Sequence, residues 1–427
     1  MAEGRLALGV DLGSSGLRLA AVTAAGDVVA EEAGPYPAAF EQPEGWRQGL
    51  ISLCLLLPAD VRRRVQALAI DGTSGTLLLC RPDGNLAEGI GRGVNLAEAL
   101  AYHRVCPEKR PEAAAIAGQG PAASASGSLA RGLRLLQAAA DARLDGPWLL
   151  RHQADWLMGW LLGDWRWGEE GNNLRLGWDL ERRSWAGRIA GQPWSQALPL
   201  IRSSGEVLGP LCATTAAALD LPGHCRVVAG STDANAAVLA AAPGDRDGVS
   251  VLGTTLVLKQ WCPEPIQAPG VSCHRVAGRW LVGGASNAGG GVLRRFFSDA
   301  QLTELSRQID PSCSSGLGLR PLPCRGERFP VEDPDLEPVL EPRPVSDALF
   351  LQGLLEGIAE IERAGWERLQ QLGAPAVQRV ISLGGGARNP QWRAIRARLL
   401  RRPVLNRPRL SAAQGMARLA ATALSTR

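Results

Sequence analysis

The sequence predicts an α/β protein built from two domains of related design. Its 427 residues exceed what one hydrophobic core usually organises, so two cores are expected. Compact apolar runs bounded by glycine-containing turns alternate with Ala/Leu-rich helical patterns along the chain. A strand-turn-strand unit around Gly13 recurs around Gly253, 240 residues later. These three observations indicate two α/β domains that share an ancestor.

Composition and charge narrow the class of protein. Apolar residues make up 45% of the chain and charged residues 21%, as in soluble globular proteins. The 46 basic and 42 acidic residues leave a net charge of +4 without a long basic run, so neither nucleic acid nor a membrane surface is an expected partner. No apolar run reaches the roughly 18 residues that cross a bilayer, and no secretion signal is evident. We expect a cytoplasmic protein, monomeric or homodimeric.

Cysteine and histidine usage argues against two other kinds of site. The nine cysteines include no C-x-x-C pair, so we expect reduced thiols rather than a disulfide framework. The four histidines never occur at the spacing of metal ligands, and Cys273 with His274 has no second pair nearby. The sequence therefore predicts no zinc site.

The N-terminal half opens with a meander of strands separated by small polar turns. Two such turns, Asp11–Gly16 and Asp71–Thr76, each follow a compact apolar run, which indicates a buried strand. Ala/Leu-rich patterns at Ser128–Ala139 and Gln153–Leu162 predict helices packed on that sheet. Strands are expected at Leu6–Val10, Leu17–Val22, Val28–Ala30, Val65–Ile70 and Leu77–Cys80, and further helices at Arg47–Leu57 and Ala59–Gln66.

The second half repeats this design. A strand at Gly223–Ala229 leads to Asp233, where an Ala-rich helix is expected because small polar residues favour helix starts. Leu-Gly-Thr-Thr at 252–255 then repeats Leu-Gly-Ser-Ser at 12–15. Further elements are expected as a helix at Asp347–Leu372, a strand at Val380–Leu383, a glycine turn at Gly384–Asn389 and a last helix at Ala412–Leu424. We expect an N-terminal domain of residues 1–240 with helix 411–427, and a C-terminal domain of residues 241–410.

The turns point to phosphate binding. Glycine and small hydroxyl residues let backbone N–H groups converge on an anion without side chains in the way. The chain has no G-x-x-x-x-G-K-[ST] sequence, which excludes a Walker-type loop, and no G-x-G-x-x-G after the first strand, which disfavours a dinucleotide fold. What remains is a pair of hairpin loops, Gly13–Gly16 and Gly253–Thr255, facing each other from two related domains.

With these loops, the chain resembles the actin-like ATPase superfamily and, within it, the FGGY carbohydrate kinases. The resemblance covers essentially the whole chain and is strongest to the small D-ribulose kinases of cyanobacteria and plants. It implies two actin-like, ribonuclease H-like domains with a cleft between them, the N-terminal domain binding sugar and the C-terminal domain binding nucleotide. The segments that carry it are Ala69–Thr76, Gln153–Leu157, Gly283–Asn287, Arg325–Pro330 and Leu351–Gly357.

The resemblance also implies roles for matching residues, with ATP and Mg²⁺ as cofactors. Asp233 matches the catalytic base that takes the proton from the sugar hydroxyl, and Asp11 matches the acid that holds Mg²⁺ and reaches the sugar. The other implied residues are Ser74 for the sugar, Ser14 and Ser15 for the transferred phosphate, Gly253 and Thr254 for the remaining phosphates, and Gly384, Gly385, Asn389 and Trp392 for the adenine.

Each of these residues has a structural explanation as well. Taken alone, Asp233 is more typical of a helix cap, Asp11 of a strand end and Gly384–Gly386 of a plain turn. Trp392 suits an ordinary core position. The combined pattern favours chemistry, because Asp11 stands in a strand-Asp-x-Gly-Ser-Ser-strand unit and Asp233 precedes the second hairpin loop.

The sequence thus predicts an ATP-dependent kinase for a small ketose, with D-ribulose as the first choice. D-Xylulose or another polyol is the alternative acceptor, because the Trp-x-Asp-type sugar motif of larger family members is not evident around Gly91–Asn95. An actin-like structural or chaperone ATPase shares the nucleotide loops and is the alternative from another class.

Overall fold

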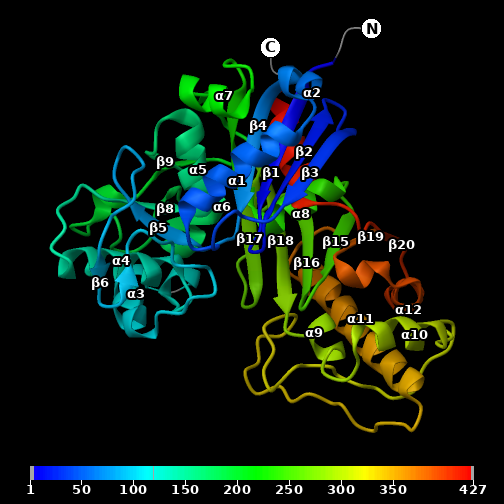
Figure 1. Ribbon diagram of the computed structural model, residues 1–427. Coiled ribbons are helices and arrows are strands. Elements are labelled where there is room, and N and C mark those ends of the chain that lie inside the picture. The colour runs from blue at the N-terminus through cyan, green and yellow to red at the C-terminus, as the bar shows by residue number, and fades with distance from the viewer. Residues whose placement is uncertain (1–3, 119, 425–427) are drawn as a thin grey trace. The chain divides into compact units, whose positions relative to one another are not determined.

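The computed structural model describes residues 4–118 and 120–424 and divides into two compact units (Figure 1). Unit 1 comprises Met1–Ala240, Arg275–Gly278 and Ser411–Arg427, and unit 2 comprises Ala241–His274 and Arg279–Leu410. Each unit contains one six-stranded sheet. In the part of the chain that is described, no helix is both long and apolar enough to cross a membrane.

The sheet of unit 1 combines an antiparallel meander with parallel strands. Its order is β13-β14-β4-β1-β2-β3. Strands β4 and β14 run parallel to β1, and every residue of β1 is buried, which explains its continuous apolar run. The strands span Leu6–Leu12 (β1), Leu17–Thr23 (β2), Val28–Gly34 (β3), Val65–Gly72 (β4), Val207–Pro210 (β13) and Arg226–Thr232 (β14).

Helices cover both faces of this sheet. On one face, α1 (Pro43–Leu56), α5 (Gln153–Leu162) and α7 (Ala213–Leu219) contribute to the core that contains Trp46 and Trp156. On the other, α8 (Asp233–Ala241) and α13 (Ala412–Ala421, red in Figure 1) pack against the sheet through small residues. A Cβ added at Gly9 of β1 would lie 1.9 Å from the Ala413 carbonyl oxygen. The alanine-rich pattern of α13 therefore serves close backbone contact.

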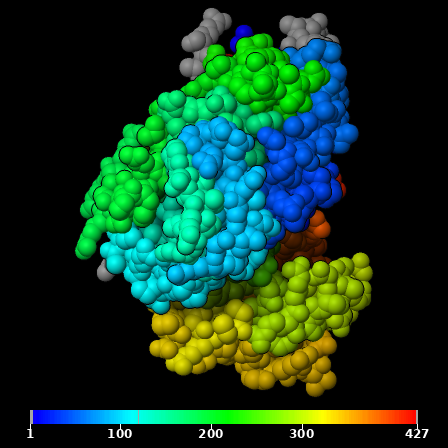
Figure 2. Space-filling view, turned by 60° about the vertical axis from the view of Figure 1, so that its left-hand side comes forward, coloured from blue at the N-terminus to red at the C-terminus, as the bar shows by residue number. Residues whose placement is uncertain are grey.

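A separate layer within unit 1 differs from the sequence prediction. Helices α3 (Arg110–Ala117) and α4 (Ser128–Asp141) do not pack on the six-stranded sheet; they form their own core with the antiparallel pair β5 (Leu77–Cys80) and β8 (Leu149–His152). Of the two helices predicted to pack on the main sheet, α5 joins its core and α4 does not. Alternate residues of β5 reach the two cores, with Leu77 and Leu79 in one and Leu78 and Cys80 in the other. Figure 2 shows the surface of this layer in cyan.

Unit 2 repeats five neighbouring strands of the unit 1 sheet, whereas the edge strands β13 and β17 have no counterpart in the other unit. Its sheet runs β17-β18-β16-β15-β19-β20, so that a meander is again followed by two strands parallel to the first. Leu252 pairs with Leu256 across the hairpin as Leu12 pairs with Leu17, which confirms the repeat seen in the sequence. The strands span Asp247–Leu252 (β15), Leu256–Cys262 (β16), Val271–Val276 (β17), Arg279–Ser286 (β18), Arg379–Leu383 (β19) and Val404–Asn406 (β20).

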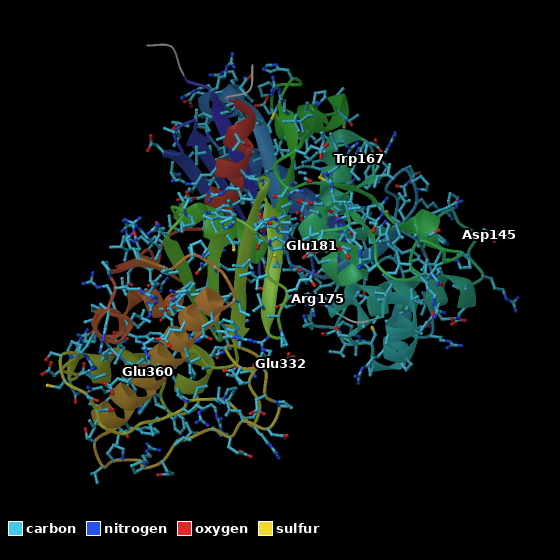
Figure 3. The ribbon with its side chains drawn as sticks, turned by 180° about the vertical axis from the view of Figure 1, so that it is seen from behind. Asp145, Trp167, Arg175, Glu181, Glu332 and Glu360 are labelled. Atoms are coloured by element: carbon cyan, nitrogen blue, oxygen red, sulfur yellow. The ribbon has the colours of Figure 1, made fainter. Side chains whose placement is uncertain are left out.

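The helices of unit 2 surround the long α11 (Asp347–Gln371), which begins where the sequence predicted it. The Ser346 hydroxyl caps this helix by accepting a hydrogen bond from the Leu349 N–H. Its apolar stripe enters the core, while Glu360, labelled in Figure 3, pairs with Arg363 at 2.6 Å. The other helices are α9 (Gly290–Leu293), α10 (Asp299–Arg307) and α12 (Pro390–Leu400).

The remaining elements are short. They comprise helices α2 (Ala59–Arg64) and α6 (Glu170–Asn173) and strands β6 (Ile90–Gly91), β7 (Val94–Asn95), β9 (Trp167–Glu169), β10 (Trp178–Asp179), β11 (Ser184–Trp185) and β12 (Leu200–Arg202).

Candidate active site

Three carboxylates meet at one edge of the unit 1 sheet. Strands β1, β4 and β14 are parallel neighbours, so their C-terminal ends lie together. Asp11 is the direct partner of Asp71 across β1 and β4, and Ser231 is the partner of Asp71 across β14 and β4. Asp233 follows at the first position of α8. Two acids predicted to act together, Asp11 and Asp233, are thus joined by a third.

Asp11 forms an ion pair with Arg18 through its carboxylate. Its carboxylate accepts a hydrogen bond from Arg18 of β2 at 3.2 Å, and the residue is 4% exposed. Burial raises the pKa of Asp11, whereas the positive charge of Arg18 and hydrogen bonding to Asp71 and Arg18 lower it, with burial the largest influence. Arg18 therefore favours the ionised form of Asp11.

Asp71 has a different environment. It is 0% exposed, and among residues 4–118 and 120–424 no group donates a hydrogen bond to either carboxylate oxygen. Burial first, and then the negative charges of Asp11 and Asp233, raise the pKa of Asp71 well above its ordinary range. Asp71 therefore retains a proton more readily than Asp11, and the ionised Asp11 can face it without full charge repulsion.

The pKa of Asp233 lies closer to neutral pH than that of an ordinary aspartate. Burial, followed by the negative charge of Asp11, raises the pKa of Asp233 to about 6, against the effect of the Ala234 N–H that lowers it. That N–H donates to the Asp233 carboxylate at 2.8 Å. The side chain thus contacts the start of its own helix, as a cap would, while keeping a pKa suited to a general base.

The predicted contact loops of unit 1 lie at the same edge. Ser14 and Ser15 are exposed at the turn between β1 and β2, and Ser74 is half-buried in the turn after β4. Gly75 beside it has a φ of +101°, a left-handed conformation that favours glycine. Hairpin and turn are therefore neighbours through the pairing of β1 with β4.

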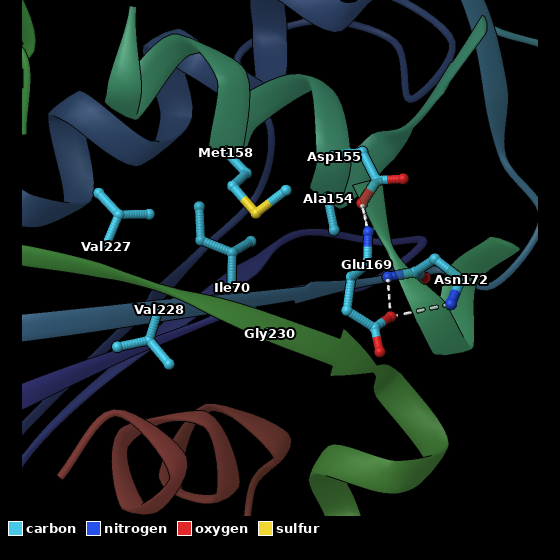
Figure 4. A pocket seen from close by; sticks show the side chains of 9 residues that line it. All are labelled: Ile70, Ala154, Asp155, Met158, Glu169, Asn172, Val227, Val228 and Gly230. Atoms are coloured by element: carbon cyan, nitrogen blue, oxygen red, sulfur yellow. Dashed lines mark hydrogen bonds between the residues drawn. The ribbon is translucent and has the colours of Figure 1, made fainter. Parts of the chain in front are cut away.

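A buried polar network supports the end of β14 (Figure 4). The Glu169 carboxylate accepts hydrogen bonds from the backbone N–H groups of Gly171 and Asn172 at 2.8 Å and from the Asn172 side chain at 2.9 Å. The same Asn172 amide donates to the Ser231 carbonyl at 3.3 Å, two residues before Asp233. Asp155 accepts from the Glu169 N–H at 2.9 Å. The network therefore fixes the end of β14, which leads to Asp233, through the bond from Asn172 to the Ser231 carbonyl.

In unit 2, the turn Gly253–Thr255 is braced by a segment that sequence reasoning did not assign. The Gly253 and Thr254 carbonyls accept from the N–H groups of Gly290 and Gly291 at 2.9 and 3.0 Å. A Cβ added at Gly289 would lie 2.6 Å from the Thr254 carbonyl oxygen. Glycines therefore let α9 approach the loop, and Thr254 stays exposed at its tip.

The second predicted nucleotide turn lies beside the first. Strands β15 and β19 are parallel partners, with Val251 opposite Leu383, so Gly253 and Gly384 follow adjacent strand ends. Gly384 has a φ of +81°, and a Cβ there would come within 2.9 Å of the Leu252 carbonyl oxygen. Gly385 is exposed. The structure therefore brings the two turns together at one edge of the unit 2 sheet.

Asn389 and Trp392 hold structural positions in this turn. The Asn389 side chain caps α12 by accepting from the Trp392 N–H at 2.9 Å, and it donates to the Ser306 hydroxyl at 2.8 Å. Trp392 is 3% exposed, and its indole N–H donates to the Leu355 carbonyl at 3.2 Å. A Cβ at Gly386 would lie 2.4 Å from that indole. The indole therefore packs in the core beneath the turn, with Gly386 against its ring. Trp392 was predicted to cover the adenine, but from this position its ring would support the Gly386 backbone instead of facing the base.

A fully buried ion pair fixes the two strands that carry these turns. Glu362 of α11 accepts from Arg396 of α12 through both oxygens, at 2.5 and 2.7 Å. Glu362 also accepts from the Ser250 hydroxyl at 2.5 Å, and Arg396 donates to the Ser382 hydroxyl at 2.6 Å. Ser250 and Ser382 are direct partners on β15 and β19. The Glu362–Arg396 pair therefore links helices α11 and α12 to strands β15 and β19.

A family match covers most of unit 2 and continues into α13 of unit 1. Residues 248–424 match the C-terminal domain of the FGGY family of carbohydrate kinases. This FGGY segment extends from β15 to the end of the described chain. It contains both turns, Gly253–Thr255 and Gly384–Asn389, as well as α9 and the Glu362–Arg396 pair.

The whole chain shares its fold with solved carbohydrate kinases. A xylulose kinase from Rhodospirillum rubrum has a TM-score of 0.79 at 21% identity, with 99% of this chain and 90% of that chain covered. A gluconate kinase from Lactobacillus acidophilus has a TM-score of 0.77 at 14% identity (99% and 90% covered). A glycerol kinase from Plasmodium falciparum with ADP has a TM-score of 0.78 at 14% identity (99% and 91% covered). The predicted two-domain, actin-like α/β fold is confirmed.

Sequence reasoning missed two participants in these sites. Asp71 was visible as the first residue of a polar turn, yet its pairing with Asp11 depends on β1 and β4 being neighbours. Gly289–Gly291 was visible as a glycine run after a strand, without a sign of which loop it would meet. Within residues 4–118 and 120–424, no group of three histidine, cysteine or acidic side chains has the arrangement of a metal centre.

Proposed function

We propose that this protein is an ATP-dependent carbohydrate kinase that transfers the γ-phosphoryl group of ATP to a hydroxyl of a small ketose, with D-ribulose as the preferred acceptor. The observation that carries the proposal is Asp233, a carboxylate at a strand end beside Asp11, whose pKa of about 6 suits a general base near neutral pH. The FGGY match of residues 248–424 supports kinase chemistry. The choice of a ketose rests on the whole-length resemblance, which is carried by five segments together: Ala69–Thr76, Gln153–Leu157, Gly283–Asn287, Arg325–Pro330 and Leu351–Gly357.

In this mechanism Asp233 accepts the proton of the acceptor hydroxyl. A sugar hydroxyl is a weak nucleophile at neutral pH, and a positioned base contributes roughly 10²- to 10⁴-fold to the rate. The hydroxyl oxygen forms a bond to the γ-phosphorus, the bond to the bridging oxygen of ADP breaks, and the proton stays on Asp233 until product leaves. Alignment and electrostatic stabilisation supply the rest of the acceleration.

Asp11 would hold Mg²⁺ in this scheme. Magnesium in phosphoryl-transfer enzymes is bound by one or two carboxylates together with substrate phosphates. Asp11, whose ionised form Arg18 favours, supplies one such carboxylate at the end of β1. When bound, the ion neutralises charge on the phosphates. Ser14 and Ser15 present hydroxyl and backbone N–H donors to the transferred group, and Ser74 presents its hydroxyl to the sugar.

The turns of unit 2 would hold the rest of ATP. Gly253 and Thr254 would contact the phosphates, Thr254 through its exposed hydroxyl, and Gly384 and Gly385 would let the adenine approach the backbone. Asn389 and Trp392 would contribute by holding that turn in shape from the side of α12.

A panel of acceptors assayed by ADP release tests this proposal. We expect kcat/KM for D-ribulose to exceed the values for D-xylulose, gluconate, ribitol and glycerol by at least about tenfold, a difference that a few well-placed hydrogen bonds supply. Comparable values for D-xylulose would overturn the D-ribulose assignment while leaving a kinase. ADP release that does not depend on any acceptor would overturn kinase activity and favour a structural or chaperone ATPase.

A further inference from the structure

Inside unit 1, hydrogen bonds lead from the hairpin loop to the residue that starts α5. Tyr36, which follows β3, donates its hydroxyl proton to the Gly13 carbonyl, with 2.7 Å between the oxygens. The side-chain amide of Gln153 lies 3.4 Å from the same hydroxyl and donates to it. Gln153 itself is 0% exposed. The loop that carries Ser14 and Ser15 is thus tied to the N-terminus of α5.

From Gln153 the bonds continue into the turn that carries Ser74. The Gln153 side-chain oxygen accepts from both the backbone N–H and the hydroxyl of Thr73, at 3.0 and 2.8 Å. The Thr73 and Thr76 hydroxyls lie 2.6 Å apart, and the Tyr102 backbone N–H donates to Thr76 at 3.1 Å. Thr73 and Thr76 are 5% and 0% exposed. The middle of the network, Gln153 with Thr73 and Thr76, is therefore buried, whereas Tyr36 at one end is half-buried.

The direction of every bond follows from simple chemistry. The Gln153 oxygen has no proton, so the Thr73 hydroxyl must donate to it. The Thr73 oxygen can then only accept, so the proton between the two threonines belongs to Thr76. At the other end, the Gly13 carbonyl can only accept, which commits the Tyr36 proton to it. The result is one series of hydrogen bonds with a single donor direction, from the Tyr102 N–H to the Gly13 carbonyl. Reversing the donor and acceptor in one bond would require reversing its neighbours as well.

We propose that Tyr36 and Gln153 are positioning residues that hold the phosphate loop Gly13–Gly16 and the sugar turn Thr73–Thr76 at a fixed distance from each other. The inference rests on the proposed function, which places Ser14 and Ser15 on the phosphoryl group and Ser74 on the acceptor. Phosphoryl transfer requires the attacking and transferred atoms to be aligned, and a misplacement of about 1 Å can cost roughly 100-fold in rate. In our proposal the hydrogen bonds through Tyr36 and Gln153 supply that alignment, and neither side chain contacts the substrate.

Tyr36→Phe is the sharpest variant because it removes one hydroxyl and keeps the ring. We expect kcat to fall about 10- to 100-fold while KM for ATP and for the ketose each change less than about threefold. Tyr102→Phe is the matched control, because the chain has two tyrosines, this one is 40% exposed, and its role in the network belongs to the backbone N–H. A Tyr36→Phe enzyme with wild-type kcat would overturn the inference.

A second pair of variants separates the hydrogen bond from packing. Thr73→Val keeps the shape of the side chain and removes the hydroxyl that connects Gln153 to Thr76, whereas Thr73→Ser keeps the hydroxyl. We expect Thr73→Ser to retain kcat within about threefold and Thr73→Val to lose it as Tyr36→Phe does. Equal losses in both variants would show that Thr73 acts through packing and would contradict the proposed chain.

Hydrogen exchange measured by mass spectrometry tests the coupling without relying on activity. In Tyr36→Phe we expect faster exchange in peptides covering residues 12–17 and also in those covering residues 72–77, with no change in Tyr102→Phe. Faster exchange at 12–17 alone would overturn the coupling even if kcat falls. Coupled exchange in a protein that phosphorylates no acceptor would uphold the coupling and refute the proposed function.

Discussion

The two sheets of this protein place different side chains at equivalent positions. In unit 1, Asp11 and Asp71 are partners at the ends of β1 and β4, whereas in unit 2 the corresponding partners are Val251 and Leu383 at the ends of β15 and β19. The hairpins that follow have nearly the same sequence, Leu-Gly-Ser-Ser and Leu-Gly-Thr-Thr, although Leu12 pairs with Leu17 and Leu252 pairs with Leu256, so the second loop is one residue shorter. One duplicated scaffold therefore carries acids at one edge and apolar residues at the other.

This difference separates two kinds of chemistry. Acidic side chains in a buried edge acquire raised pKa values, as Asp11, Asp71 and Asp233 do, and the pKa of Asp233 reaches about 6. The unit 2 edge is built from glycine, threonine and apolar residues instead, with Gly384 in a left-handed conformation against the Leu252 carbonyl. We therefore expect substitutions in the two edges to affect different kinetic constants.

The largest expected effect comes from the acidic edge. Asp233→Ala should lower kcat roughly 10²- to 10⁴-fold, because it removes the proposed base, while the affinity for ATP changes less than about threefold. Steady-state ADP release and calorimetric ATP binding measure the two quantities. Asp60→Ala is the control, an exposed acid in the first turn of α2. Near-normal turnover of Asp233→Ala would place the base elsewhere.

Substitutions in the glycine edge of unit 2 should change KM for ATP, whereas those in the acidic edge should change kcat. Gly384→Ala forces a side chain onto a residue with φ +81° and within 2.9 Å of the Leu252 carbonyl oxygen. A left-handed L-residue costs about 1–2 kcal/mol, which corresponds to about a tenfold rise in KM for ATP if the turn must reform around the nucleotide. KM for the ketose should stay within about threefold. In Gly223→Ala, the control, an added Cβ meets no atom within 4 Å. An unchanged KM for ATP would remove Gly384 from the nucleotide site.

A smaller effect concerns pH and stability at the acidic edge. The pKa of Asp233 is about 6 in the folded chain and about 3.9 in an unfolded one, so folding favours its protonated form. That contribution is fully present below pH about 4 and is lost as the pH rises through about 6. Asp233→Asn should therefore raise the free energy of unfolding by about 1–3 kcal/mol at pH 8 and by much less at pH 4.

Urea unfolding at the two pH values measures this difference, and the wild-type kcat/KM should decline as the pH falls through about 6. An Asp233→Asn variant no more stable than the wild type at pH 8 would contradict the raised pKa and, with it, the contrast between the two edges.

Local signals predicted much of the fold. Helix α5 spans Gln153–Leu162 as expected, and α11 ends one residue before the predicted Leu372, because apolar periodicity and helix caps act within a few residues. Helix α1 begins four residues earlier than the predicted Arg47, since Pro43 is accommodated in its first turn. The turns at Gly13, Gly253 and Gly384 were also predicted, because glycine beside small polar residues marks them directly.

Other features could not be read from local signals. The helices α3 and α4 share the apolar pattern of helices that cover a sheet, and only the topology shows that they pack on β5 and β8. The pairing of Asp11 with Asp71 spans 60 residues, and the bond from Gln153 to Tyr36 spans 117. Whether Trp392 faces a ligand or the core is likewise a question of what packs beside it.

By itself the sequence determined the kinds of elements, the repeated hairpins and the residues able to bind phosphate or move a proton, because these depend on side-chain chemistry and short-range periodicity. The tertiary structure decided which of them meet. Parallel pairing of β1, β4 and β14 brings three acids to one edge, and the burial that results raises their pKa values, an effect that no residue possesses in an isolated segment.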